Sequence, residues 1–371
     1  MKYIKPLIII ATTAFALALI FACRQAKSEE PVNANQPESA ATPKTNVPIT
    51  IAAVGDIMLG SPFPNDTRMP PNDGADLLKG VTPILSAADI AFGNLEGPMV
   101  DSGTSAKCSP GSTKCFAFRV PTRYGKYLKD AGFDVMSLAN NHAGDFGDAG
   151  RTSTRKVLDE LGIKHAGSDR ETFSTVYFEA KGRKVAVIGF AHNKLTPNVN
   201  DLAFARQLVT AATKKADLVI VSFHGGAEGT DRQHVPNQTE IYVGETRGNL
   251  PLFAHTVIDA GADLVLGHGP HVLRGMEIYK DRLIAYSLGN FCTYGWFKLE
   301  AETALTAILE ARLAPDGKFV GGRIHNGRQQ GRGIPVLDNT GDSIRKIREL
   351  SLADFGTNAP KIDDNGSIMP K

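Results

Sequence analysis

The sequence has 371 residues, of which 42% are hydrophobic and 22% charged, and its formal net charge is +2. This composition is typical of a globular protein and excludes a largely disordered chain. Because the two excess positive charges, Lys2 and Lys5, lie at the extreme N-terminus, the rest of the chain is neutral, which argues against a nucleic acid as the main partner.

The N-terminal segment has the pattern of a targeting signal. Lys2 and Lys5 precede the apolar run of residues 7–22, and Ile20-Phe21-Ala22-Cys23 resembles a lipobox. We predict a signal peptide over residues 1–22, lipid attachment at Cys23, and an exported protein that is tethered to the membrane, in the periplasm or at the cell surface. An uncleaved membrane anchor is the alternative, although the run is shorter than the ~20 apolar residues that span a bilayer comfortably.

Residues 23–48 are rich in proline, alanine, asparagine and serine without apolar periodicity, so a flexible, lipidated tether is predicted there. Further along, Cys108 and Cys115 enclose a turn-rich hexapeptide. An exported protein would meet an oxidising compartment, where these two cysteines are predicted to form a disulfide. Cys292 is then left as a buried or semi-buried free thiol.

From residue 49 the sequence alternates between apolar strand patterns and amphipathic helix patterns. Towards the C-terminus the pattern changes to strands joined by a hairpin turn. A mixed α/β sandwich is therefore predicted over residues 49–355. The polar residues 356–371 are expected to fray. Strands are predicted over 49–54, 89–92, 133–138, 184–190, 217–223, 262–266, 282–287, 304–313 and 319–323, and helices over 124–131, 152–161, 202–215 and 250–260.

Polar residues follow five of these strands, at the edge where open α/β sheets bind their ligands. Carboxylate, amide and imidazole groups suit Mn, Fe, Zn or Mg, and one or two such divalent ions are predicted. Two ions bridged by a carboxylate could activate a water molecule and hold a phosphoryl oxygen, with an imidazole as general acid. The candidate metal ligands are Asp56, Asn94, Glu96, Asn141, His224, His268 and His271, and the candidate general acid is His142.

Each motif by itself also has a structural explanation. Asp56 could end a strand, Asn94 and Glu96 could form a turn, and Asn141 could cap a helix. Their shared position at the carboxyl ends of strands favours a single polar site.

Six motifs in order resemble the CapA family, which is associated with synthesis of bacterial capsule and poly-γ-glutamate. That family resembles the calcineurin-like metallophosphoesterases, so the resemblance implies a four-layer α/β/β/α sandwich with a two-metal site, here followed by a C-terminal β-hairpin. It covers roughly residues 49–335. The motifs are residues 54–60, 93–96, 137–142, 224–228, 267–271 and 286–291.

The resemblance also implies roles for single residues. Asp56 matches the aspartate of the first Asp-x-His motif, but Met58 replaces its histidine. Asn94 falls where the bridging aspartate would lie, with Glu96 as a substitute. The remaining matches are Asn141 and His142 with the Asn-His motif, His224 with the lone histidine, and His268 and His271 with the final pair. Glu228 matches the family's glutamate and could bind substrate or orient His224. Asn290 is a second candidate for substrate binding, with a structural role as the alternative.

Two functions remain open from the sequence. The first is a metal-dependent hydrolase of phosphoesters or of an amide-linked anionic polymer such as poly-γ-glutamate. The second is a non-catalytic accessory subunit that assists a membrane synthase or export complex, on a phosphoesterase scaffold that has lost ligands. The replacement of a histidine by Met58 keeps the second alternative open.

Overall fold

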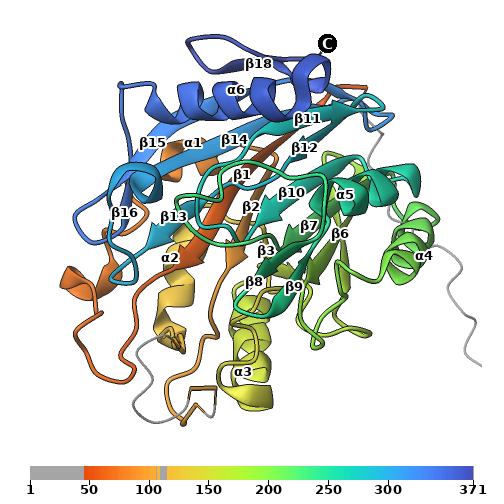
Figure 1. Cartoon of the computed structure of the whole chain (residues 1–371). Coiled ribbons are helices and arrows are strands. Elements are labelled where there is room, and N and C mark those ends of the chain that lie inside the picture. Colours follow the sequence, from red (N-terminus) through yellow and green to blue (C-terminus); the bar gives the residue numbers. More distant parts are fainter. Residues whose placement is uncertain (1–45, 106, 109–114, 371) are drawn as a thin grey trace, which may run out of the picture. The chain divides into compact units, whose positions relative to one another are not determined.

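The computed structural model describes residues 46–105, 107–108 and 115–370 (Figure 1). The predicted signal peptide, the lipidation site Cys23 and nearly all of the predicted tether lie outside these residues and stay predictions. Within the described ranges, no helix combines the length and apolar character needed to cross a bilayer.

One sheet holds ten of the described strands. β1 is parallel to β2 and β13, while β14 and β15 continue the sheet in antiparallel fashion. Its strands are β1 (Ile49–Met58), β2 (Ile90–Leu95), β3 (Val135–Ser137), β4 (Lys164–Ala166), β13 (Asn290–Thr293), β14 (Leu305–Leu313), β15 (Phe319–Gln330), β16 (Ile334–Leu337), β17 (Lys361–Ile362) and β18 (Ser367–Met369).

A second sheet of six described strands runs in the order β11-β12-β10-β7-β6-β5, with parallel pairing in its centre and antiparallel strands at both edges. A separate hairpin is formed by β8 (Glu240–Tyr242) and β9 (Glu245–Gly248). The six strands are β5 (Thr175–Ala180), β6 (Arg183–Ala191), β7 (Leu218–His224), β10 (Leu264–His268), β11 (Met276–Tyr279) and β12 (Arg282–Ala285).

Six α-helices and four short 3₁₀-helices accompany the sheets in the part of the chain that the structure describes. The α-helices are α1 (Thr82–Leu85), α2 (Gly125–Asp130), α3 (Gly147–Glu160), α4 (Leu202–Thr213), α5 (Leu250–Asp259) and α6 (Asp342–Phe355). The 3₁₀-helices are η1 (Pro71–Gly74), η2 (Thr122–Tyr124), η3 (Ala301–Ala304) and η4 (Gly356–Asn358).

The two sheets are stacked face to face. Successive residues of a strand point to opposite faces of its sheet, so the two faces of one sheet pack against different layers. In β1, Ile51 and Ala53 enter a core shared with β6, β7 and β10 of the other sheet, whereas Ala52 and Val54 pack with α1, α2 and α3. On the far face of the second sheet, α4 and α5 cover β6, β7 and β10 (Figure 1). The result is the α/β/β/α sandwich, in which each fully buried Val, Leu or Ile contributes about 1.5–3 kcal/mol.

The C-terminal segment differs from the expectation of a frayed tail. Ile362 and Ile368 are buried, and β18 pairs with β15. Asp363 accepts backbone hydrogen bonds from Asn365 and Ser367 and so closes the turn between β17 and β18. The turn between β17 and β18 is polar in composition, so the sequence did not indicate that Ile362 and Ile368 on its two sides are buried.

The helix α6 was also not predicted. It buries Ile344, Ile347 and Leu350, the first two in the central core, and this spacing of three residues is helical in period. Alternating charged residues between these positions obscured the pattern.

Gly55 lets a neighbouring backbone approach β1 at the point where the polar residues begin. A Cβ atom at this position would lie 1.9 Å from the carbonyl oxygen of Gly289. That same oxygen accepts a hydrogen bond of 2.9 Å from the amide of Asp56. The glycine therefore fixes where Asp56 sits relative to the segment that leads into β13.

We predict that Gly55→Ala lowers the free energy of unfolding by about 3 kcal/mol, because the clash is with backbone and cannot be relieved by a side-chain rotation. Urea unfolding followed by circular dichroism would measure it. Gly80→Ala is the matched control, since its nearest new contact, to the carbonyl oxygen of Pro335, would be an ordinary 3.7 Å. Equal stability of the two variants would contradict the prediction.

Candidate metal centre

Strand pairing in the first sheet places three polar side chains next to one another. Asp56 of β1 is the register partner of Asn94 in β2 and of Asn290 in β13. The register shifts beside Asp56 on both sides, and such irregularities often re-aim side chains near active sites. Because β1 extends to Met58, beyond the predicted end at residue 54, Asp56 lies inside a strand and not in a loop.

The second sheet contributes histidines from two adjacent parallel strands. His224 ends β7 and is the register partner of His268, which ends β10. His271 follows three residues later with a left-handed backbone (φ 60°). This conformation costs a non-glycine residue about 1–2 kcal/mol, and such strain concentrates at functional sites.

Asp56, Glu96 and His271 form the tightest group, with ligand atoms all within 4.8 Å of one another, and all three are buried. The Nδ1 atom of His271 lies 3.0 Å from Asp56 Oδ2. It also lies 3.1 Å from the Oδ1 atom of Asn290, an acceptor, which places the proton on Nδ1. The Nε2 atom of His271 is thereby directed to the interior of the group, 4.0 Å from Glu96 Oε1.

Glu96 occupies the middle of a larger cluster. Its Oε1 atom lies 3.7 Å from His224 Nε2 and 3.8 Å from His142 Nε2. Neither carboxylate oxygen of Glu96 has a hydrogen-bond partner, and the same holds for His224 Nε2 and, despite its close contact, Asp56 Oδ2. Buried polar atoms are rarely left without partners, so these unpaired oxygen and nitrogen atoms fit a divalent cation.

The pKa shifts of the metal-free cluster reflect burial and crowding. Burial raises the pKa of Glu96 well above its usual value, and the charge of Asp56 adds to this rise. For His271, burial alone would lower the pKa, but the carboxylates of Glu96 and Asp56 outweigh it and raise the pKa to about 10. Burial lowers the pKa of His224 well below its usual value. Without a metal, therefore, the imidazole of His271 carries a proton beside the two carboxylates.

His142 stands at the edge of this cluster, and two contacts hold its ring. The ring stacks on Phe118 with centroids 3.7 Å apart. Its Nδ1 atom lies 2.7 Å from Asp145 Oδ2, and because a carboxylate only accepts, Nδ1 carries the proton and Nε2 faces Glu96. Burial lowers the pKa of His142 to about 4, although Asp145 opposes this shift. Sequence reasoning missed Asp145, for which the only signal was its position three residues after His142.

Glu228 reaches the cluster from the loop after β7. Its Oε2 atom lies 3.9 Å from His271 Nε2, and its Oε1 atom accepts a 2.8 Å hydrogen bond from Arg247 of β9. Arg274, which is fully buried, forms two 2.8 Å bonds with Glu240 of β8, and Glu240 in turn accepts from the amide of Ala227. A buried ion pair thus attaches the hairpin to the loop that carries Glu228.

The other predicted site residues take different positions. His268 donates from Nε2 to the carbonyl of Val54, 3.1 Å away, and so links the two sheets. Among the described contacts none joins Asn141 to the cluster, although its Oδ1 atom is buried without a partner. Asn140 instead donates to Asn94 Oδ1 at 3.2 Å. Asn290, predicted to bind substrate, contacts His271.

The cysteines lie away from the candidate ligands. Cys108 and Cys115 are joined by a disulfide, and Cys292 is a buried free thiol in the core between the first sheet and its helices. Burial raises the pKa of the Cys292 thiol far above its usual value. No thiolate ligand is therefore available from Cys292 to the cluster.

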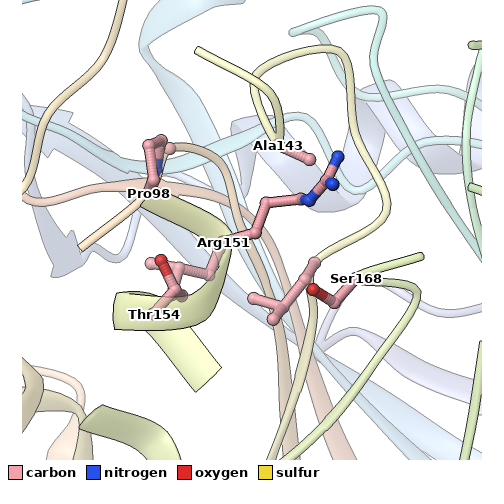
Figure 2. A pocket seen from close by; sticks show the side chains of 8 residues that line it. Pro98, Ala143, Arg151, Thr154 and Ser168 are labelled. Carbon is pink, nitrogen blue, oxygen red and sulfur yellow. The ribbon is translucent and has the colours of Figure 1, made fainter. Parts of the chain in front are cut away.

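A small hollow is lined by residues of β2, of α3 and of the loops that follow β2, β3 and β4, and neither Glu96 nor His142 is among its lining residues. Figure 2 shows Arg151 of α3 in the middle of the side chains that line it, which include Pro98, Ala143, Thr154 and Ser168. The hollow has room for about one water molecule. It is too small to hold a substrate.

The part of the chain that carries the candidate ligands also matches a known protein family. The family described as bacterial capsule synthesis protein PGA_cap matches residues 50–294. The chain belongs to this family. The PGA_cap match contains every candidate ligand as well as Glu228 and Asn290, whereas β14 to β18 and α6 lie beyond it.

Two relatives of this PGA_cap protein are similar over most of its length. The capsule biosynthesis protein CapA of Bacillus anthracis is 30% identical over 327 residues, which cover 83% of this chain and 74% of that protein. The PGA biosynthesis protein CapA of Bacillus subtilis (strain 168) is 32% identical over 286 residues, covering 72% and 69%. Among solved structures, a putative 5′-nucleotidase from Staphylococcus aureus in complex with alpha-ketoglutarate matches with a TM-score of 0.43 and 14% identity, over 82% of this chain and 58% of that one.

We predict that this PGA_cap protein binds divalent metal more tightly as the pH rises. The pKa of His271 is about 10 in the metal-free protein, so its imidazole is protonated at neutral pH and must lose that proton to become a ligand. Each proton released makes the apparent affinity rise about tenfold per pH unit below that pKa. Calorimetric titration with Mn²⁺ between pH 6.5 and 9, in buffers of different ionisation enthalpy, would count the protons.

The control for this titration is His255→Gln. His255 stacks on Tyr279 and bonds to Glu277, away from the cluster, so this variant should keep the same pH dependence. His271→Gln should lose tight binding. An affinity that does not change with pH would show that His271 is not a ligand.

Proposed function

We propose that this protein acts in the synthesis of a bacterial capsule or of poly-γ-glutamate as a metal-dependent hydrolase of the phosphoesterase type. We further propose that it is exported and held at the membrane by a lipid on Cys23. The observation that carries the enzymatic proposal is the buried group of Asp56, Glu96 and His271, whose ligand atoms converge within 4.8 Å. Membership in the PGA_cap family supports the role in polymer synthesis.

The residues that would hold the metal are Asp56, Glu96, His224 and His271. Their donor atoms are carboxylate oxygens and imidazole nitrogens, the set that Mn, Fe and Zn share. Once bound, a divalent cation polarises a phosphoryl or carbonyl oxygen and lowers the pKa of a bound water. Asn94 supports this set from the side, because its amide donates to Asp56 Oδ1 at 2.8 Å and its oxygen accepts from Asn140.

His142 is the candidate for proton transfer. Asp145 holds the proton on Nδ1, so the Nε2 atom is left to exchange a proton with a group that enters the cluster. With a pKa of about 4 in the metal-free protein, the ring is neutral at pH 7 and accepts a proton at Nε2. An anionic phosphoryl group beside Nε2 would raise this pKa and favour the imidazolium that the predicted general acid requires.

Glu228 is the candidate substrate-facing group on the other side of His271. Its side chain is partly exposed, and Arg247 holds it in place. Because the chain beyond residue 22 is neutral overall, an anionic polymer or phosphoester would have to be recognised locally, at this edge of the cluster, and not by a long-range field.

A non-catalytic accessory role is the second candidate, and one observation favours it. Both polar ends of the Asn94 side chain are already hydrogen-bonded within the protein, and Met58, where the related phosphoesterases have a histidine, is buried in the core. On this view the protein would assist a membrane synthase or export complex without hydrolysing anything.

We predict that His142→Ala strongly slows hydrolysis but retains metal, whereas His224→Ala with Glu96→Gln loses metal and hydrolysis together. General acid–base catalysis contributes about 10²–10⁴-fold, so His142→Ala should lower kcat by that factor. Elemental analysis of the purified proteins measures the metal, and turnover of a nitrophenyl phosphodiester and of a γ-linked glutamyl peptide measures the activity. Bound metal with no turnover of either substrate would favour the accessory role, and no bound metal would overturn the enzymatic proposal.

A further inference from the structure

Residues on both sides of the Cys108–Cys115 disulfide contact the pair formed by His142 and Asp145. On one side of the disulfide is Lys107, whose Nζ atom lies 2.6 Å from Asp145 Oδ1 and 3.0 Å from His142 Nδ1. The same ammonium group donates to the carbonyl of Asn141 at 3.1 Å. Lys107 therefore pairs with Asp145 and donates to the backbone of Asn141, and its ammonium group lies beside the Nδ1 atom of His142, which is itself a donor to Asp145.

On the other side of the disulfide is Phe118. Its backbone amide donates to Asp145 Oδ2 at 2.7 Å, and its ring stacks on His142 at an interplanar angle of 10°. The two contacts fix both the carboxylate and the plane of the imidazole. Trp296 packs against the outer side of Phe118, with ring centroids 4.1 Å apart.

We infer that Lys107 and the Cys108–Cys115 disulfide are positioning elements for His142, which hold its imidazole in the orientation that the proposed hydrolysis uses. The inference rests on the proposed function for the role of His142, but the contacts that carry it are independent of any metal. None of the described contacts joins Lys107 or the two cysteines to the proposed ligands, so they act through Asp145 and the ring of Phe118. The proposed ligands are Asp56, Glu96, His224 and His271.

The physical reason is the burial of Asp145. Its side chain has no exposed surface, while that of Lys107 is 30% exposed. A buried carboxylate that loses its cationic partner is strongly destabilised, so without Lys107 the Asp145 carboxylate would move towards water and release Nδ1 of His142. The disulfide keeps the Cα atoms of the two cysteines 5.5 Å apart and so restricts how far Lys107 and Phe118 can separate from the pair.

Four variants of the full chain test this inference. Lys107→Met removes the charge, Lys107→Arg retains it, and Cys108→Ser with Cys115→Ser opens the segment. Lys126→Met is the matched control, because Lys126 forms an exposed ion pair with Asp130 on α2. Turnover of a nitrophenyl phosphodiester with Mn²⁺ and acrylamide quenching of Trp296 are measured for each. Trp296 is the only tryptophan in the sequence, so its fluorescence reports on Phe118.

We expect Lys107→Met and the double serine variant to lower kcat about tenfold or more with little change in KM, as loss of an orienting partner typically does. Lys107→Arg should recover part of this loss, and Lys126→Met should behave as wild type. The double serine variant should also leave Trp296 more accessible to acrylamide. Wild-type kcat and wild-type quenching in both Lys107→Met and the double serine variant would overturn the inference.

The failure of the proposed function would look different. If the wild-type protein hydrolyses no substrate with any metal, the enzymatic proposal fails, and the positioning inference is decided by spectroscopy alone. The ¹⁵N signals of the His142 ring then report whether Nδ1 keeps its proton. An unchanged ring signal together with unchanged Trp296 quenching in Lys107→Met and the double serine variant overturns the inference, and a change confined to these variants supports it.

Discussion

The burial of two carboxylates beside one another, Asp56 and Glu96, is the constraint on which the centre depends. Both side chains are fully buried, and like charges this close raise the free energy of the ionised state unless a cation lies between them. In the metal-free protein the proton on His271 meets this need. The two sheets must therefore stack so that a histidine from beyond the second sheet's β10 reaches a carboxylate of the first, and His271 does so with a left-handed backbone.

The alternation of strands and helices was predictable because buried parallel strands form continuous apolar runs bounded by glycine and polar residues. The pairing that assembles the centre was not, because register depends on contacts between residues far apart in the chain. That Asp56 lies inside β1, opposite both Asn94 and Asn290, follows from irregular pairing on both sides of the strand. The hairpin of β17 and β18 was missed for a related reason, since only two isoleucines attach it to the core.

The residue types predicted which polar side chains would lie close together, but they did not predict the role of each one. His268 and His271 look equivalent in sequence, but His268 uses Nε2 to bond to the carbonyl of Val54, whereas His271 directs Nε2 at Glu96. The difference comes from which ring nitrogen meets an acceptor, Nε2 in His268 and Nδ1 in His271, because that acceptor sets the tautomer. The sequence did not indicate roles for Asp145 and Lys107, because their contacts with His142 form only when the loop around His142 is folded.

The charges of the centre bear on how many ions it holds. Asp56 and Glu96 supply two negative charges, and Glu228 is already paired with Arg247. One divalent cation with neutral histidine ligands would balance this charge, whereas two cations would leave an excess of two positive charges in a buried site. Asn94 matters here, because a carboxylate in its place would add the third negative charge that a second ion needs. We therefore expect a single tightly held ion in the free protein, with a second binding only when an anionic substrate brings its own charge into the cluster.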